Sequence, residues 1–443
     1  METASRSPAT DETTAAGIAH ARRILLVFAV TLAAMLYLHR VCISQSQQLI
    51  SDELGLTKAQ MGLAMTVFGI AYGLFEMPFG WLGDRIGART LLTCAVSWWS
   101  FFTVATGWAS GLLSLVTNRF LFGAGEAACF PNLTRAFSRW FTGVDRTRAQ
   151  ALMWIAARWG GAFTPLLVIV SLEKLNWRQS FYLFGSVGFV WALFFCWWFR
   201  DTPAEYLAAR HAAAGEASVP VMRGRPGEDG APWGCFVRSR SVWLICLQYT
   251  CLSYGFWFYM TWLPTYIREQ FGLQHADRYA AALLAAPPLF LAGISCVLTG
   301  WITPRLVGRI GDMARVRRLL GSSGCALACV MLILSTHLRN PVLAMAAMGF
   351  SAFGNDMAMP GSWAGCMDMG GRFVGTLSGI MNTWGCFGGL LAPATIPYIL
   401  KGAHNDWSVV IHVLAAGYAV GALCWFGIDP VTPLDQSHEG ATA

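Results

Sequence analysis

The feature that most constrains the fold of this chain is a repeated run of apolar residues, each about as long as a membrane is thick. A helix needs roughly 20 apolar residues to cross about 30 Å of hydrocarbon. Only 12% of the 443 residues are charged, whereas soluble domains carry about 25%. The runs show no strand-like alternation, so the sequence predicts an all-α polytopic membrane protein. The twelve predicted transmembrane helices are residues 24–50, 57–79, 90–108, 111–134, 149–172, 179–199, 241–267, 279–303, 319–336, 341–364, 374–399 and 406–427.

The longest polar segment leaves six of these spans on either side, and its composition is typical of a flexible linker. A weak internal repeat supports two related halves. GWLGDRIG at residues 80–87 and GWITPRLV at residues 300–307 both follow the second span of their half. We therefore predict two pseudo-symmetric six-helix bundles. The predicted units are a cytoplasmic tail at 1–23, the N-terminal bundle at 24–199, a cytoplasmic linker at 200–240, the C-terminal bundle at 241–428 and a cytoplasmic tail at 429–443.

The basic residues follow the distribution of topology signals. If the N-terminus is cytoplasmic, the inner segments hold 21 of the 31 Lys and Arg residues and the outer loops hold 7. Cytoplasmic loops carry such an excess, so we predict a multi-pass protein of the cytoplasmic (inner) membrane with both termini inside. The net charge of +7 is then no sign of nucleic-acid binding. The 13 cysteines include no CxxC pair, and we expect neither a metal, a disulfide nor a cofactor.

One stretch, NRFLFGAGEAACFP at residues 118–131, carries an arginine and a glutamate inside an otherwise apolar, glycine-rich run. Arg119 and Glu126 are two helical turns apart and lie on the same side of a helix. Charges at such depth mark transport pathways by default. The alternative is a permanent ion pair that holds helices together, but a rise of about 10.5 Å makes a direct bond difficult.

In the first span, Tyr37, Arg40 and Ser44 share a helical face. The planar guanidinium of arginine donates two parallel bonds to a carboxylate and stays charged at any physiological pH. Arg40 is therefore a candidate for binding an anionic substrate. The alternative is an arginine that caps or snorkels at the outer end of the span.

Further polar side chains lie well inside apolar runs, where hydroxyls and amides suit a polyhydroxylated ligand. For each of them, hydrogen bonding between helices is an equally good interpretation. Asp356 is either a second proton site or the partner of an arginine, Arg158 is either functional or structural, and Glu76 is assigned a structural role near the inner mouth. The candidate ligand contacts are Tyr72, Gln248, Asn355 and Asn382, whereas Tyr249 is expected in the core.

The loop after the second span reads GWLGDRIGARTLL at residues 80–92. It resembles the signature of the major facilitator superfamily, G-x-L-x-D-R-x-G-x-R/K. Asp84 can accept bonds from a helix N-terminus or from an arginine across the interface between the halves, and so latch one conformation. The alternative is a basic loop with a tight turn. The residues that match, and that we expect to form the latch, are Gly80, Asp84, Arg85, Gly87 and Arg89, with Leu82.

Within that superfamily the chain resembles the anion:cation symporter family over nearly its whole length. The resemblance rests on YLHRVCIS in span one, R-x(3)-G-x-G-E-A-x(2)-F-P in span four, NWRQSFYLFG, FYMTWLPTYI and DMGGRFVGTLSGIMNTWG. It implies a major facilitator fold and transport of organic anions such as sugar acids, usually with protons. It also implies that Arg40 holds the substrate carboxylate beside Tyr37, that Glu126 is the protonation site, and that Arg119 modulates it. The implied substrate contacts are Tyr72, Gln248 and Asn382.

One position departs from the family pattern. Sugar-acid members usually carry an aspartate that takes a proton immediately before the span-one arginine, and this chain has His39. Histidine can titrate near neutral pH and replace it in proton coupling. The alternative is that His39 is a hydrogen-bonding core residue and that fewer protons, or none, are coupled.

We therefore predict a secondary active transporter that moves a hexuronate, an aldonate or a related organic anion by alternating access, with proton symport, as a monomer in the lipid bilayer. An anion uniporter and an organophosphate exchanger are close alternatives, and a transporter-like sensor is an alternative of another class. No span holds a clustered nucleophile and base, metal-ligand spacing or a phosphate loop. An enzyme is not expected.

Overall fold

The computed structural model describes residues 8–213, 233–272 and 278–434, and within these ranges the chain is almost entirely helical. The first half of the chain ends with a short helix, α9, in the segment between the sixth and seventh predicted spans. Its helices are α1 (Pro8–Gln45), α2 (Gln47–Leu54), α3 (Lys58–Ile86), α4 (Ala88–Thr106), α5 (Leu112–Glu126), α6 (Cys129–Trp140), α7 (Val144–Leu172), α8 (Trp177–Trp198) and α9 (Pro203–Ala213).

The second half repeats the pattern of long helices joined by short loops. Its elements are α10 (Trp233–Arg238), α11 (Arg240–Thr261), α12 (Leu263–Phe271), α13 (Arg278–Ile310), α14 (Met313–His337), α15 (Pro341–Met369), the 3₁₀ turn η1 (Gly371–Phe373), α16 (Val374–Gly402) and α17 (Trp407–Gly427). Within the described residues, eight helices are long and apolar enough to cross a membrane: α1, α3, α7, α8, α13, α14, α15 and α17. The prediction of an all-α polytopic membrane protein is confirmed.

Side-chain caps fix several helix starts. Thr57 and Gln60 form a capping box at the start of α3, with a bond of 2.9 Å from the Thr57 N–H to the Gln60 side chain. Asn176 plays the same part at the start of α8. The side chains of Asp312 and Asn340 accept from the first free N–H groups of α14 and α15. These polar residues separate apolar runs, which is why the predicted spans and the observed helices agree in order.

The fourth predicted span, residues 111–134, is not one continuous helix. It divides at Ala127 and Ala128 into α5 and α6. Pro131 has no N–H with which to bond the carbonyl of Ala127, and glycine at position 125 is a weak helix former. The break leaves Glu126 as the last residue of α5. The seventh span divides similarly at Trp262, just before a proline at the start of α12.

The ends of two predicted spans also differ from the structure. Helix α1 begins at Pro8 and so takes in much of the segment predicted as a tail, of which residues 1–7 lie outside the described residues. This extension is held in place, since Arg22 donates to the carbonyl of Trp140 at 2.8 Å. The predicted linker contains α9 and α10, and its residues 214–232 lie outside the described ones, as do 435–443 of the C-terminal tail.

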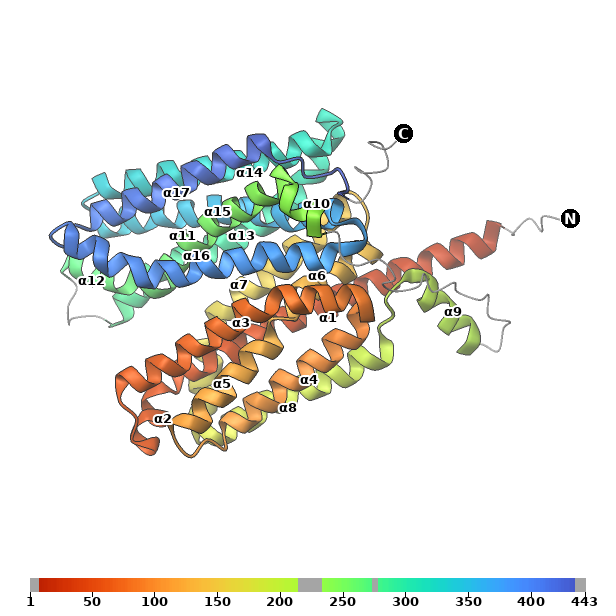
Figure 1. The fold of residues 1–443 in the computed structure, drawn as a ribbon. Coiled ribbons are helices and arrows are strands. Elements are labelled where there is room, and N and C mark those ends of the chain that lie inside the picture. Colours follow the sequence, from red (N-terminus) through yellow and green to blue (C-terminus); the bar gives the residue numbers. More distant parts are fainter. Residues whose placement is uncertain (1–7, 214–232, 273–277, 435–443) are drawn as a thin grey trace, which may run out of the picture.

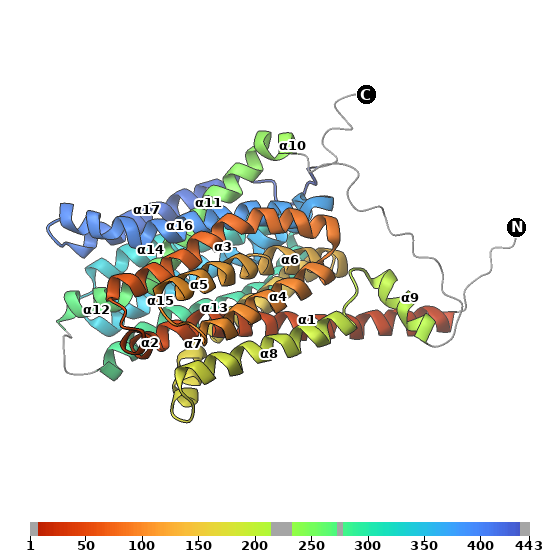
Figure 2. The ribbon, with the colours of Figure 1, turned by 60° about the horizontal axis from the view of Figure 1, so that its bottom comes forward.

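The helices of the first half lie together on one side of the molecule, and those of the second half on the other (Figure 1). The halves meet where α3 packs along α16 and α7 packs along α13. Helices α9 and α10 lie at one end of the bundle, and α2 and α12 lie at the opposite end, as the turned view in Figure 2 also shows. These two ends are called the α9/α10 end and the α2/α12 end below.

Candidate functional site

A cavity of about 690 Å³ lies between the halves, within the range of about 300–1,000 Å³ typical of small-molecule sites. Its wall includes Ser44 and Thr261, near the last residues of α1 and α11, so the cavity extends from the middle of the bundle toward the α2/α12 end. Both halves contribute side chains. Among the residues singled out from the sequence, those that line it are Tyr37, Arg40, Tyr72, Arg119, Arg158, Tyr249, Asn355 and Asn382.

Arg40 and Glu126 form an ion pair at the wall of the cavity. Nε of Arg40 donates to one carboxylate oxygen of Glu126 at 2.9 Å, and Nη2 lies 2.7 Å from the same oxygen. Glu126 is completely buried, whereas 17% of the Arg40 side chain is exposed. The second oxygen of Glu126 has no hydrogen-bond partner. Arg40 can therefore meet a solute in the cavity, whereas the Glu126 carboxylate lies behind it, out of contact with the cavity.

Aromatic rings hold Arg40 in place. Its guanidinium carbon lies 4.8 Å from the ring centre of Tyr72, 5.2 Å from Phe68 and 5.4 Å from Tyr37. Such rings attract a cation through their negative faces. They also keep water away from the guanidinium, which strengthens its interaction with an anion.

Arg119 lines the cavity beside this pair but has a different set of partners. Within the described residues, no carboxylate lies at ion-pair distance from it. Its guanidinium carbon lies 4.6 Å from the ring centre of Phe122 and 4.8 Å from that of Phe68, and its Nε has no hydrogen-bond partner. The alternative of a permanent Arg119 to Glu126 ion pair does not occur in this conformation.

A second buried ion pair joins the two halves. Arg158 on α7 donates to both oxygens of Asp356 on α15, at 2.6 and 2.8 Å. Asn355 donates to the same carboxylate at 2.8 Å. Both charged side chains are almost completely buried, and the ring of Phe256 lies 3.8 Å from the guanidinium carbon. Of the two interpretations left open for Asp356, the partner of an arginine describes this conformation.

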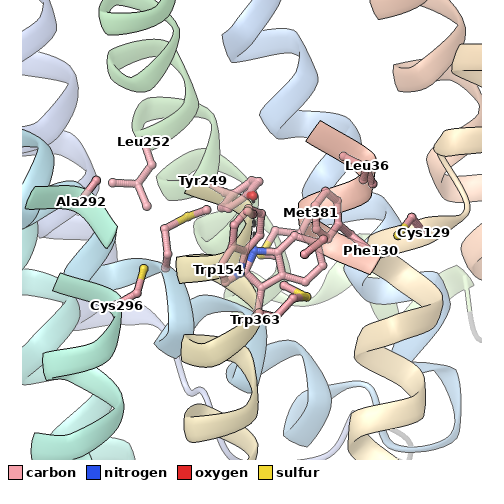
Figure 3. Packing of buried hydrophobic residues seen from close by; sticks show 14 of the residues in the cluster. Leu36, Cys129, Phe130, Trp154, Tyr249, Leu252, Ala292, Cys296, Trp363 and Met381 are labelled. Atoms are coloured by element: carbon pink, nitrogen blue, oxygen red, sulfur yellow. Dashed lines mark hydrogen bonds between the residues drawn. The ribbon is translucent and has the colours of Figure 1, made fainter. Parts of the chain in front are cut away.

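An aromatic cluster forms the floor of the cavity on the side of the α9/α10 end. Phe130 of α6 stacks on Trp154 of α7, with ring centres 4.9 Å apart, and Trp154 contacts Trp363 of α15 at 5.6 Å. The indole of Trp363 donates to the hydroxyl of Tyr249 on α11 at 3.3 Å. Figure 3 shows these four side chains converging from both halves. They separate the cavity from the α9/α10 end.

Four of the predicted substrate-binding and proton-coupling residues do not line the cavity: Glu126 and Asp356, which lie behind the arginines they pair with, and Gln248 and His39. Gln248 is fully buried, and its side-chain oxygen accepts from Ser362 at 3.2 Å. His39 is 1% exposed, and its Nε2 lies 2.8 Å from the carbonyl oxygen of Phe184 on α8. The imidazole therefore points to a neighbouring helix of its own half.

Glu76 lies in a different place from the inner mouth where the sequence interpretation put it. It is fully buried between α3 and α16, where its carboxyl accepts from the amide of Asn382 and, at 3.3 Å, from the thiol of Cys386. Both of these α16 residues line the cavity. The reason for the difference is the helix pairing: α3 packs along α16 for most of its length, so a residue well before its end at Ile86 faces the other half.

The loop motif predicted as a latch, which begins at Gly80, joins the halves at the α9/α10 end. Asp84 accepts from the backbone N–H groups of Gly375 and Thr376 at the start of α16, at 3.0 and 2.7 Å. Arg135 of its own half donates to the same carboxylate at 3.1 Å. Gly80 lies against Gly375 so closely that an added Cβ would be 2.2 Å from the Gly375 oxygen.

The remaining motif residues act within the first half. Arg89 donates through Nε to the carbonyl of Cys196 at 3.0 Å. Gly87 has φ +93°, which an L side chain rarely adopts. Arg85 is exposed, with its guanidinium carbon 4.0 Å from the ring centre of Trp81. Only Gly80 and Asp84 of the motif therefore reach the opposite half.

Another polar contact between the halves was missed from the sequence. Asp368 on α15 accepts from Arg146 on α7 and from Arg317 on α14. All three lie in or beside loops that were interpreted only as carriers of positive charge. The aromatic floor was missed as well, because nothing in the sequence sets its aromatic residues apart from the many others in the spans. Only contacts between helices far apart in the sequence distinguish these residues from other charged or aromatic residues of the chain.

Comparisons with known proteins bear on the fold and the family of the chain. A probable sulfoacetate transporter of Cupriavidus necator is 30% identical over 408 residues, which are 91% of this chain and 93% of that protein. The D-galactonate transporter of Escherichia coli is 26% identical over 419 residues, 91% of this chain and 94% of that protein. The solved structure of the proton:xylose symporter XylE has the same fold, with a TM-score of 0.70 at 14% identity, covering 92% of this chain and 96% of that one.

A family model described as Major Facilitator Superfamily matches residues 24–393. This match covers most of the chain and includes both ion pairs and the motif that begins at Gly80. The resemblance inferred from that motif is confirmed. This multi-pass membrane protein is a transporter rather than an enzyme, and it belongs to the major facilitator superfamily.

Proposed function

We propose that the protein moves a small organic anion across the cytoplasmic membrane by alternating access and couples it to protons. The observation that carries the proposal is the exposed guanidinium of Arg40 in a largely apolar cavity, paired with a completely buried carboxylate. A carboxylate or sulfonate that enters the cavity meets a preformed site of the kind that bidentate recognition requires.

Competition for Arg40 supplies the coupling. An incoming anion and Glu126 seek the same guanidinium, which is 2.7 Å from the Glu126 carboxylate in the empty cavity. If Glu126 stays ionised while the anion takes its partner, a bare carboxylate is left in a buried site, which is costly. Protonation of Glu126 removes that cost. The anion and the proton therefore bind more favourably together than separately, as symport requires.

Arg119 supports the same step. It lines the cavity with no carboxylate partner among the described residues and lies on the helix that carries Glu126. In the proposal its positive charge attracts the anion and stabilises the ionised form of Glu126 when the cavity is empty. His39 takes the role of a hydrogen-bonded core residue, because its imidazole points to α8.

The hydroxyls of Tyr37 and Tyr72 and the amides of Asn355 and Asn382 favour a substrate that bears hydroxyl groups. Together with relatives named for sulfoacetate and D-galactonate, they support a small sugar acid or a related organic acid as the cargo. With both termini in the cytoplasm, the conformation described here has its cavity directed outward. Two predicted six-helix bundles would then rock about the substrate.

The test is uptake of labelled galactonate, glucuronate, galacturonate, glucarate and sulfoacetate by proteoliposomes, with and without an inside-alkaline pH gradient. Accumulation of one compound only with the gradient is the expected result. Arg40→Ala and Arg40→Lys should both lose accumulation of that compound, because neither side chain offers a planar fork. Arg148→Lys serves as the matched control, because Arg148 is an exposed arginine that pairs with Asp145.

Each alternative has its own outcome. Equilibration of the anion without accumulation would make the protein a uniporter. Strict dependence on a phosphorylated compound inside the vesicle would make it an exchanger. Accumulation that survives Arg40→Ala in a folded protein would remove Arg40 from the mechanism.

A further inference from the structure

The proposed function leaves one buried carboxyl group without a role, that of Glu76. It lies directly behind the cavity wall formed by Asn382 and Cys386, and it is fully buried. The ion pairs found among the described residues include none with Glu76. An ionised carboxylate buried at this depth without a cation is costly, so such groups gain a proton or mark a functional pathway.

The neighbours of Glu76 suit both of its protonation states. The amide of Asn382 and the thiol of Cys386 donate to the Glu76 carboxyl, and the hydroxyl of Tyr72 lies beside them, where it accepts from Asn382 at 3.4 Å. Groups of these three kinds can donate a hydrogen bond to a carboxylate or, after a rotation, accept one from a carboxylic acid. The environment of Glu126 is different, because its partner is the guanidinium of Arg40, which can donate a hydrogen bond but cannot accept one. The site of Glu76 can therefore gain and lose a proton without leaving a polar atom unpaired.

The balance of charge around the cavity depends on this proton. Three guanidinium groups line the cavity, those of Arg40, Arg119 and Arg158. Two carboxylates, on Glu126 and Asp356, pair with the first and the third of them. An ionised Glu76 would bring the total to three positive and three negative charges. A neutral Glu76 leaves one positive charge uncompensated, which is the condition that favours binding of an anion.

Glu76 also senses the occupant of the cavity. The titratable groups on the helices around it are Arg40 on α1, whose guanidinium carbon lies 4.8 Å from the ring centre of the neighbouring Tyr72, Cys386 on α16, and Tyr249 on α11, which packs against α16 at Gly385. The positive charge of Arg40 attracts the ionised form of Glu76. An anion on Arg40 weakens that attraction and so favours the neutral acid. By linkage, protonation of Glu76 favours the anion equally.

The position of Glu76 at the contact between the halves gives the proton a route. Glu76 belongs to the first half, and Asn382 and Cys386 belong to the second. The backbones meet closely here, since a Cβ added to Gly379 would lie 2.7 Å from the Glu76 carbonyl oxygen. Rocking of the halves must part α3 from α16 and expose the carboxyl to the α9/α10 end.

We propose that Glu76 binds a second transported proton, taken up through the cavity beside Asn382 and Cys386 and released when α3 and α16 separate. The inference rests on the proposed anion transport at the same cavity. The proton adds to the Glu76 carboxylate to give the neutral acid, and the same O–H bond breaks on release. Each anion thus travels with the proton of Glu126 and that of Glu76.

The first experiment measures the number of protons per anion from the reversal potential of uptake in proteoliposomes. Glu76→Gln keeps the hydrogen bond to Asn382 but cannot ionise, so it should carry one proton fewer per anion than the wild type while still exchanging anion across the membrane. Glu76→Asp should restore the wild-type number. Glu173→Gln, which removes an exposed carboxyl at the end of α7, should change nothing.

The second experiment needs no substrate. Infrared difference spectra of the purified protein between acidic and alkaline buffer should show the carbonyl stretch of a buried carboxylic acid. The component of the band that comes from Glu76 should be missing in Glu76→Gln and shifted in Glu76→Asp, whereas any component from Glu126 should stay. An unchanged band in Glu76→Gln, or an unchanged number of protons per anion, would overturn the inference while leaving the proposed function intact.

If the wild type transports no organic anion, the proposed function fails on its own. The infrared band then still decides whether Glu76 gains and loses a proton. A folded Glu76→Gln protein whose band is identical to that of the wild type excludes the exchange, whatever the cargo.

Discussion

Glu126 accepts a hydrogen bond from Arg40, 86 residues away in the sequence, and pairs with it rather than with Arg119 on its own helix. The break between α5 and α6 makes Glu126 the last residue of α5 and directs its carboxyl toward α1. As a result, one guanidinium serves both the solute cavity and the buried acid. Arg119 is left as a cation held by aromatic rings.

Glu126→Gln should separate transport of the anion from its coupling. Glutamine keeps a hydrogen bond to Arg40 but cannot take a proton, so accumulation driven by a pH gradient should be lost while exchange of labelled for unlabelled anion continues. The measurement is uptake and counterflow in the same proteoliposomes. Loss of both activities in a folded protein would mean that Glu126 binds the anion rather than coupling it.

The Arg158 and Asp356 pair should be the most sensitive electrostatic contact in the protein. Asp356→Ala leaves a buried guanidinium without its partner, and removal of one member of such a pair typically costs about 3–5 kcal/mol. Replacing both residues, as Arg158→Met with Asp356→Leu, should recover most of that stability. Unfolding in detergent, monitored by a denaturant titration, gives the free energies.

The exposed pair formed by Asp145 and Arg148 provides the control. Their side chains are 43% and 51% exposed, and removing such a pair costs about 0–1 kcal/mol. If Asp145→Ala and Asp356→Ala lowered the free energy of unfolding by similar amounts, the prediction for the buried pair would be wrong.

Gly80→Ala should open the α9/α10 end of the protein. The added Cβ would lie 2.2 Å from the carbonyl oxygen of Gly375, so α3 and α16 must separate. Spin labels at Ile86 and Ile310, both exposed near the ends of their helices, should report a longer distance by pulsed electron resonance. Gly62→Ala on the same helix meets no atom within 4 Å and should leave the distance unchanged.

Acid should weaken the contact between α2 and α8. The indole of Trp177 and the guanidinium of Arg178 donate to Glu53 and hold the pKa of that carboxyl below its usual range. A carboxyl with a lowered folded pKa stabilises the fold above its unfolded pKa of about 4.3, and that contribution is lost as the pH falls through the folded value.

Thermal unfolding of the wild type should therefore lose a small additional amount of stability below about pH 4.3 that Glu53→Gln does not lose. The effect is small because half of the Glu53 side chain is exposed and solvent screens the contact. Identical pH profiles for the two proteins would contradict the assignment.

The fold was predictable because its strongest determinant is local. Apolar runs of helical length, separated by capping residues such as Thr57 and Asn340, determine where helices begin and end. Hydrocarbon leaves no other way to satisfy the backbone. The breaks at Ala127 and Trp262 were missed because the predicted spans were drawn from average hydropathy. A proline removes a backbone N–H and so weakens the helix before it, but it hardly changes that average.

The candidate residues were predictable by the same logic, since a full charge in an apolar run needs a reason. Arg40, Arg119 and Arg158 were identified in this way, and all three line the cavity. The sequence could not assign their partners, because an ion pair between Arg158 and Asp356 spans 198 positions and depends on how α7 meets α15. The orientation of His39 toward Phe184 likewise depends on which helix lies beside α1.

The sequence by itself determined the helices, their order and the kind of charge buried within them, because hydropathy and helix capping act over a few residues. Tertiary packing alone decided which charge meets which, and the clearest case is Glu76. Its position in the chain suggested an inner mouth, but the pairing of α3 with α16 places its carboxyl against Asn382 of the other half. Electrostatic energies depend on distance in space, and only the packed helices define those distances.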